Sequence, residues 1–204
     1  MLIDYREDMT LRDARRDYFA ANHFGDDGGY GEAWVDFKLG VIPFPIPNAP
    51  SRVRAVKFHD LHHVLTGYDT NTVGEFEISA WEIAAGCKGF AAAWALNLSG
   101  MAAGAIVAPQ RIWRAFMRGR RSRSLYGESM GELLGTTVGE ARARYLPRDR
   151  EEGVTASDVA AFVAALGAGL TAMGVFTLVT VPLVPVGLLA VAMRRRARPT
   201  HDLA

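Results

Sequence analysis

The strongest constraint on the fold is an uncharged stretch near the C-terminus. Residues 159–193 contain no Asp, Glu, Lys or Arg, and four arginines follow within residues 194–198. Such a stretch is longer than the ~20 apolar residues that a helix needs to cross the hydrocarbon core of a bilayer. Pro182 and Pro185 interrupt it, so we expect one span or a bent re-entrant hairpin rather than two spans. The other interpretation is a helical hairpin buried in a soluble core.

The charges at the two ends of the chain indicate a membrane face. Arginines that flank an apolar segment favour the cytoplasmic side, and the charged N-terminus (MLIDYREDMTLRDARRD) has no apolar region typical of a secretory signal. A hairpin that enters one leaflet keeps both ends in the cytoplasm, whereas a single crossing would separate them. We therefore predict association with the inner (cytoplasmic) membrane at its cytoplasmic face.

Length and composition indicate one helical domain with an appendage. The chain has 204 residues, which we divide into a domain at 1–150 and an apolar, membrane-associating tail with a basic end at 151–204. With 23 Lys and Arg against 22 Asp and Glu, the balanced charge argues against a nucleic-acid partner. Cys87 is the single cysteine, which excludes a disulfide framework and a cysteine zinc site. A homo-oligomer is left open.

The local patterns predict an all-α fold. Thr10 and Asp13 are typical of a helix cap, followed by a helix that stops at Gly25. A second, shorter helix is expected within residues 30–40, then a proline-rich extended connection at 42–50. Further helices are expected at 52–65 and at 75–94. The second continues into an uncharged run that ends at residue 108, and we interpret this run as a core helix rather than a second span. No strand is predicted.

The second half of the domain is also predicted to be helical. The arginine-rich segment 111–123 is interpreted either as a surface helix that lies against anionic lipid or as a solvated helix end. Residues 127–146 are expected to form one helix that stops before Pro147. Thr155 and Asp158 are expected to cap the apolar tail helix.

The sequence FHDLHHVLTGYDTNTVGE, residues 58–75, contains the candidate chemistry. On a helix, His59, Asp60 and His63 share an arc of about 100°, while His62 lies outside it and is expected to be replaceable. Two imidazoles four residues apart can bind one metal ion. Asp60 is then a third ligand or orients an imidazole, and Glu75 arrives after a loop at the start of the next helix.

Two interpretations without a metal remain open for this segment. Thr72 and Glu75 also have the spacing of a capping box, in which the Glu75 carboxylate turns back to the backbone. Histidines near a helix C-terminus gain from the helix dipole, which accounts for His62 and His63 without any ion.

The motif His59-Asp60-x-x-His63, eleven residues and Glu75 resembles the signature of the coenzyme Q biosynthesis protein four family. RVR before the motif, LTGY after it and GE at its end agree with the resemblance, which covers about residues 18–94. The resemblance implies a helical protein whose His59, Asp60, His63 and Glu75 bind one divalent metal and are the catalytic residues. The apolar tail is a departure from the family pattern.

The resemblance also implies a function at the membrane. The family is linked to oxidative decarboxylation of a polyprenyl benzoate-type precursor in ubiquinone synthesis and to other quinone-biosynthesis enzymes as partners. Imidazole and carboxylate ligands suit Zn, Fe or Mn. One alternative is a non-catalytic scaffold that binds a polyprenyl quinone precursor or other isoprenoid lipid, and a weaker one is a metal-dependent hydrolase.

Overall fold

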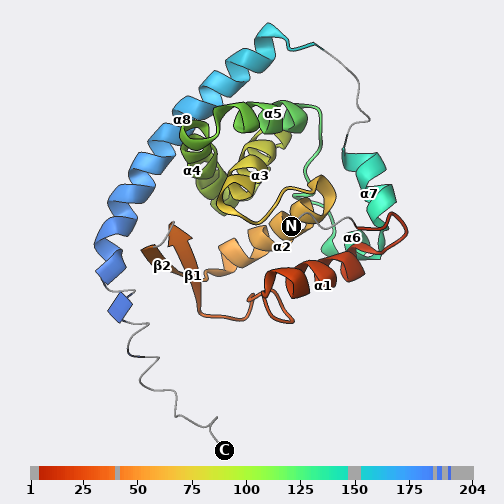
Figure 1. The fold of residues 1–204 in the computed structure, drawn as a ribbon, viewed down its shortest axis with the longest axis horizontal. Helices are drawn as coiled ribbons and strands as arrows, with labels where there is room; N and C mark the ends of the chain where they lie inside the picture. Colours follow the sequence, from red (N-terminus) through yellow and green to blue (C-terminus); the bar gives the residue numbers. More distant parts are fainter. Residues whose placement is uncertain (1–4, 40–41, 147–152, 186–187, 190–192, 194–204) are drawn as a thin grey trace, which may run out of the picture.

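The computed structural model describes residues 5–39, 42–146, 153–185, 188–189 and 193. These residues form eight α-helices, one two-stranded β-hairpin and a short 3-10 turn (Figure 1). The mostly helical fold that the sequence predicts is confirmed. The predicted arginine-rich end, residues 194–198, lies outside the described residues.

The first two long helices begin and end where local signals place them. Helix α1 (Leu11–Asn22) starts at Thr10, whose side chain accepts a hydrogen bond from the Asp13 amide, as predicted. Helix α2 (Pro50–Thr66) has a proline in its first turn and ends at Gly67, which has a positive φ of 74°. α1 packs against α2.

The helix predicted within residues 30–40 is wrong. Strand β1 (Trp34–Leu39) pairs antiparallel with β2 (Ile42–Pro47), and Trp34 lies opposite Pro47. Alternate prolines hold β2 extended, as expected for that segment, and β1 adopts the same conformation to pair with it. The alternation of apolar and polar residues in VDFKL is the strand signal that the helical interpretation passed over.

The predicted helix from residue 75 to 94 is divided into two. Helix α3 (Thr72–Ala85) and helix α4 (Ala91–Val107) are separated by a turn in which Gly86 and Lys88 have positive φ angles. Helix α5 (Pro109–Arg120) follows, and α3 packs against both α4 and α5. A side chain at Gly119 would collide with the Trp81 carbonyl oxygen, so this glycine permits the close approach of α5 to α3.

The single helix predicted at residues 127–146 is also two helices. Helix α6 (Met130–Gly135) is followed by α7 (Val138–Tyr145), whose N-cap Thr137 forms a capping box with Glu140. Thr137 also forms a β-bridge with Thr10, so the two residues before α7 are held extended and the helix cannot continue through them.

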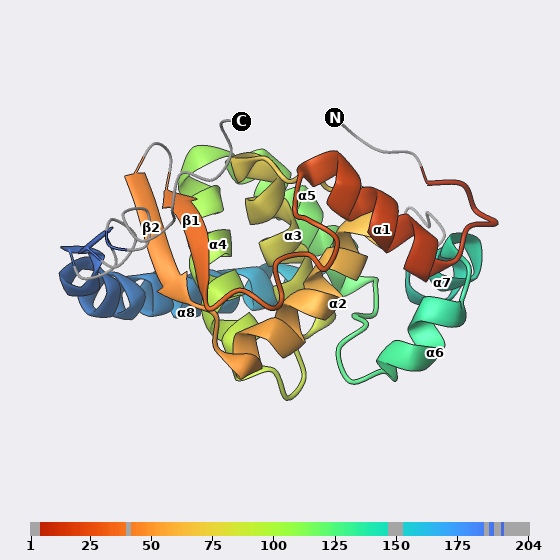
Figure 2. The same ribbon diagram turned by 90° about the horizontal axis from the view of Figure 1, so that it is seen from below.

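Helix α8 (Ala156–Thr180) lies along the outside of the molecule, against α4 and the end of α5 (Figures 1 and 2). The predicted capping box of Thr155 and Asp158 is present. The ring of Phe162 contacts the rings of Trp113 and Phe116, with centroids 5.0 and 5.2 Å apart. A 3-10 turn (Val181–Leu183) follows where the sequence places the first interrupting proline.

The outward surface of α8 is apolar. Its segment Ala156–Val175 is long and apolar enough to cross a membrane, and only 6% of that stretch is buried in the protein. Leu178 is 78% exposed. A helix buried in a soluble core would not leave such a surface open, so α8 is an apolar helix able to associate with a membrane.

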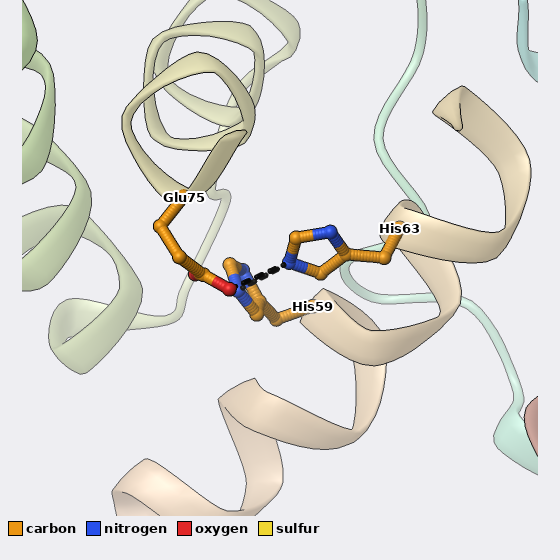
Figure 3. A group of neighbouring side chains, drawn as sticks. All are labelled: His59, His63 and Glu75. Atoms are coloured by element: carbon orange, nitrogen blue, oxygen red, sulfur yellow. Dashed lines mark hydrogen bonds and ion pairs between the residues drawn. The ribbon is translucent and has the colours of Figure 1, made fainter. Parts of the chain in front are cut away.

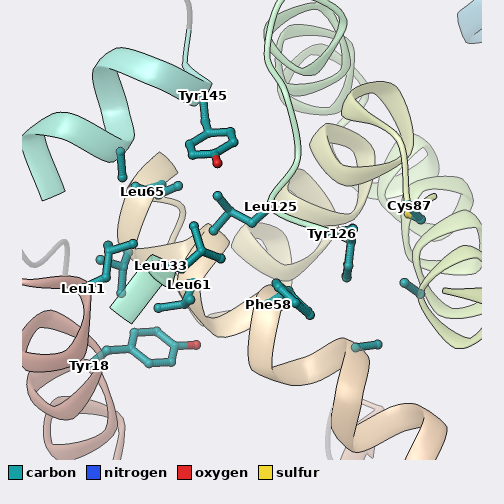
Figure 4. Packing of buried hydrophobic residues seen from close by; sticks show 14 of the residues in the cluster. Leu11, Tyr18, Phe58, Leu61, Leu65, Cys87, Leu125, Tyr126, Leu133 and Tyr145 are labelled. Atoms are coloured by element: carbon teal, nitrogen blue, oxygen red, sulfur yellow. The ribbon is translucent and has the colours of Figure 1, made fainter. Parts of the chain in front are cut away.

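The core is built around α2. Buried side chains of α2, including Leu61 and Leu65, contact residues from α1, from the segment after α5 and from α7 (Figure 4). Leu125 and Tyr126 of that segment are almost fully buried. These contacts fix α2 and so fix the direction in which its histidines point.

Candidate metal site

Three side chains from α2 and α3 converge on one point (Figure 3). His59 and His63 lie one turn apart on α2, and Glu75 faces them from the first turn of α3. The Nε2 atoms of the two histidines are 3.2 Å apart. Glu75 Oε2 is 3.3 Å from His59 Nε2, and its Oε1 is 3.4 Å from His63 Nε2. The three ligand atoms lie within 4.8 Å of one another, so the group could hold a metal ion.

The start of α3 directs Glu75 toward the histidines. Asn71 is the N-cap, because its Oδ1 accepts a hydrogen bond of 2.9 Å from the Gly74 amide. A side chain at Gly74 would collide with the Asp69 carbonyl oxygen, so only glycine fits there. Since Asn71 rather than Thr72 caps the helix, Glu75 is free of the capping role, and its carboxylate faces the His59 and His63 surface.

Hydrogen bonds on the far side of each ring fix the tautomers. His63 Nδ1 lies 3.0 Å from the Tyr68 carbonyl oxygen, which can only accept, so Nδ1 carries the proton. His59 Nδ1 lies 2.9 Å from Glu82 Oε1 and donates to it in the same way. Whenever either ring is neutral, the lone pair of its Nε2 therefore points toward the shared site.

The convergent atoms fit a metal ion. Two lone pairs and a carboxylate repel one another at these distances unless a proton or another cation lies between them. Ligand atoms ~2.1 Å from a zinc-sized ion are ~3.0 Å apart at a right angle and ~3.4 Å apart at a tetrahedral angle. The Nε2 atoms are 3.2 Å apart, within that range, and each lies 3.3 to 3.4 Å from a different oxygen of the Glu75 carboxylate.

The electrostatics of the site agree with cation binding. Burial alone would lower the pKa of His59, but Glu82 and Glu75 outweigh it and raise that pKa well above its ordinary value. Desolvation alone would raise the pKa of Glu75, but His63 and His59 lower it to about 2. Glu75 is thus an anion at neutral pH and attracts a positive charge.

One side of the site is open and the other is closed. The Glu75 side chain is 41% exposed and that of His59 20%, whereas that of His63 is only 1% exposed. The Tyr18 ring stacks on His63, with centroids 5.6 Å apart and planes 22° apart. A molecule from outside would therefore reach an ion here past Glu75.

The structure does not bring Asp60, the fourth predicted ligand, into this group. Asp60 is buried, and its Oδ2 accepts a hydrogen bond of 2.5 Å from the Tyr30 hydroxyl. Burial raises the pKa of Asp60. Its carboxylate therefore connects α2 to the segment before β1 instead of facing Glu75, and the three-residue group replaces the four-residue set.

His62 lies outside the ion-binding group, but its surroundings contradict the expectation that it is replaceable. The residue is fully buried. Its Nδ1 donates to Glu82 Oε1 at 2.7 Å, and its Nε2 accepts a hydrogen bond of 2.8 Å from the Leu125 amide. The ring therefore connects α2 to α3 and to the segment that follows α5.

Sequence reasoning missed Glu82. This carboxylate is fully buried and contacts both His59 and His62. Burial opposes its ionisation, but the two imidazoles outweigh that effect and lower its pKa. Its position gives one usable signal, because residues seven apart on a helix lie on the same face and Glu82 is seven residues after Glu75.

No protein-family model, curated protein or solved structure matches this chain. The resemblance of residues 59–75 to the coenzyme Q family thus remains a prediction from the motif. The chemistry of the site rests on two imidazoles and a carboxylate arranged around one point, a ligand set that suits Zn, Fe or Mn and leaves coordination positions for another molecule.

Proposed function

We propose that the protein is a membrane-associated metalloprotein of ubiquinone or related prenyl-quinone biosynthesis. In this proposal His59, His63 and Glu75 hold one divalent ion. The observation that carries the proposal is the convergence of the Nε2 atoms of His59 and His63 and the Glu75 carboxylate on one point, with the Nδ1 atom of each ring turned away to another acceptor. The motif at residues 59–75 supplies the pathway, through its resemblance to the coenzyme Q family.

The proposed reaction occurs at the ring carboxylate of a polyprenyl benzoate-type precursor. Replacing that carboxylate by a hydroxyl from water releases carbon dioxide, one proton and two electrons, and an oxidant such as dioxygen accepts the electrons. A bound metal would supply Lewis-acid polarisation of the ring oxygens. Two histidines and one carboxylate with open positions are also the ligands of non-haem iron(II) sites that use oxygen, which favours Fe among the three metals.

The chain's own residues have three roles in this proposal. The hydrogen bonds from His59 and His63 to Glu82 and Tyr68 orient both rings toward the ion. The stacked Tyr18 ring covers His63 and excludes water from that side. The exposed side at Glu75 admits the aromatic head group of the substrate.

The apolar surface of α8 supports a lipid-borne substrate. A polyprenyl chain does not dissolve in water, so its head group must be presented from the membrane. The outward apolar surface of α8 and the exposed Arg114 of α5 would hold the protein on a bilayer that contains anionic lipid. The cytoplasmic face and contacts to other quinone-biosynthesis enzymes belong to the same proposal.

Metal analysis tests the site directly. The purified wild type is expected to contain about one Zn, Fe or Mn ion per chain, and the double variant His59→Ala/His63→Ala is expected to contain none. Glu77→Gln is a matched control, because this carboxylate lies two residues after Glu75 on α3 and pairs with Arg111 instead. Equal metal in the double variant and the wild type would refute the site.

A precursor assay then tests the reaction. Cells that depend on the double variant are expected to accumulate the carboxylated ring precursor, while cells with Glu77→Gln are not. Normal conversion by a folded protein that has lost its metal would reject the catalytic role.

A non-catalytic lipid-binding scaffold is the second candidate. It is favoured by the placement of the ligands on two different helices, because an ion at this point would connect α2 to α3 and stabilise the fold. In a scaffold, loss of the ion lowers the thermal stability of the protein and leaves the ring chemistry intact. Metal analysis together with the precursor assay therefore separates the two candidates.

A further inference from the structure

The buried carboxylate of Glu82 is hydrogen-bonded on all sides. Its Oε1 accepts from His59 Nδ1 at 2.9 Å and from His62 Nδ1 at 2.7 Å. Its Oε2 accepts from the Tyr126 hydroxyl at 2.7 Å and from the Asn97 side-chain amide. The four donors come from α2, from α4 and from the segment after α5, so Glu82 connects three parts of the core.

The four donors explain why a carboxylate is stable at this point. A charged group without exposed surface is costly unless hydrogen bonds replace its hydration. A glutamine of the same shape has one acceptor oxygen and one donor nitrogen, so it cannot accept from all four groups. The position therefore suits an anion, and the His59 imidazole lies between that anion and the candidate ion.

We infer that Glu82 is a positioning residue that orients His59 for metal binding and strengthens its Nε2 as a ligand. A carboxylate that accepts from the far nitrogen of a metal-binding histidine fixes its tautomer and raises its basicity. This inference rests on the metal site proposed above. Glu82 lies outside the group of three ligands, but the metal affinity of that group depends on it.

The two ligand histidines differ in this respect. His63 donates to the Tyr68 carbonyl oxygen, a neutral backbone acceptor that no side-chain substitution removes. His59 donates to an ionised side chain. A substitution outside the three ligands can therefore change the basicity of His59 through its hydrogen bond to Glu82. The hydrogen bond of His63 offers no such route.

The position of Glu82 is itself fixed by His62. The His62 ring shares Glu82 Oε1 with His59, and its other nitrogen accepts from the Leu125 amide. The backbone after α5 thus holds His62, His62 holds Glu82, and Glu82 holds His59. This sequence of contacts makes the orientation of His59 depend on packing far from the ion.

Cobalt binding to Glu82→Gln tests the inference. Co²⁺ is the probe because its visible absorption reports the ligand geometry of the site. In the full-length protein, Glu82→Gln is expected to lower the Co²⁺ affinity about 10- to 100-fold and to shift the absorption bands. Tyr126→Phe is the matched control, because it removes one donor to Glu82 but keeps the carboxylate next to His59, and we expect its Co²⁺ affinity to change less than about threefold.

The thermal unfolding of both metal-free variants distinguishes positioning from general stability. We expect both substitutions to lower the unfolding temperature, and only Glu82→Gln to alter the cobalt spectrum. An unchanged affinity and spectrum in a folded Glu82→Gln protein would overturn the inference. So would an equal loss of affinity in Tyr126→Phe, because that result assigns Glu82 a structural role alone.

Imidazole NMR of the metal-free wild type provides a readout that needs no variant. The inference expects the His59 proton on Nδ1 at a pH where the ring is neutral, and a neutral ring protonated on Nε2 would contradict it. A wild type that binds no cobalt, or a His59→Ala variant that binds it equally well, would instead refute the metal site. Failure of the inference and failure of the proposed function are therefore distinguishable.

Discussion

His62→Phe is expected to destabilise the protein strongly and to weaken metal binding only modestly, because Glu82 keeps its hydrogen bonds from His59, Asn97 and Tyr126. The substitution leaves the buried Leu125 amide without its 2.8 Å partner, which costs ~1–3 kcal/mol. It also removes one of the two hydrogen bonds to Glu82 Oε1, a bond to a charged group that contributes ~1.5–3 kcal/mol. Because His59 still donates to that oxygen, we expect a total loss of about 2–5 kcal/mol in the free energy of unfolding.

Denaturant unfolding of the metal-free protein measures this loss, and metal analysis of the protein as purified, before the metal is removed, measures the occupancy of the site. His23→Asn is the control, since it replaces an exposed histidine at a left-handed position that asparagine tolerates. The control is expected to stay within about 0.5 kcal/mol of the wild type. A His62→Phe protein that is equally close to the wild type would refute the role of His62 as a buried connection between α2, α3 and Leu125.

Three further predictions concern the site and its surroundings. At a metal concentration about 100 times Kd, binding contributes ~2.7 kcal/mol to stability. Removing the ion with a chelator is therefore expected to lower the unfolding temperature by about 5–11 °C, which calorimetry measures. No shift would mean that the ion does not stabilise the fold. The lowered pKa of Glu75, about 2, means that its carboxylate contributes stability above about pH 4.3 and that this contribution is lost as the pH falls toward 2. The stability difference between metal-free wild type and Glu75→Gln should therefore shrink over that range in acid titrations, and a constant difference would contradict the assignment. Tyr30→Phe leaves Asp60 Oδ2 without its hydroxyl donor and is expected to cost ~1–3 kcal/mol in denaturant unfolding with unchanged metal content, whereas a loss of metal would show that Asp60 acts on the ion.

Features of the fold that depend on neighbours in sequence were predictable. The caps at Thr10 and Thr155 need only residues within three positions, and both are present. The β-hairpin is only weakly indicated by the sequence, because the alternation in VDFKL is short and β1 finds its hydrogen-bond partners only in β2. The turn after α3 was missed because Lys88 adopts a positive φ that its residue type does not indicate.

In the candidate site, too, only the features that depend on sequence neighbours could be predicted. Spacing on one helix places His59 and His63 together, and the motif adds Glu75. The hydrogen-bond partner of Asp60 could not be predicted, because Tyr30 lies thirty residues earlier, in a segment interpreted as a helix. The spacing of Glu82 from Glu75 indicates its helix face but not its role, which follows from donors that three separate parts of the chain bring to it.

The short connection between α2 and α3 has a consequence for the order in which the protein folds. His59 and Glu75 are 16 positions apart, whereas the contact of Tyr126 with Glu82 spans 44. Closing the shorter loop costs less chain entropy and is a faster event. An emerging chain can therefore form the pair of helices that contains all three ligands, and can capture an ion with it, before Asn97 and Tyr126, the later donors to Glu82, have been synthesised.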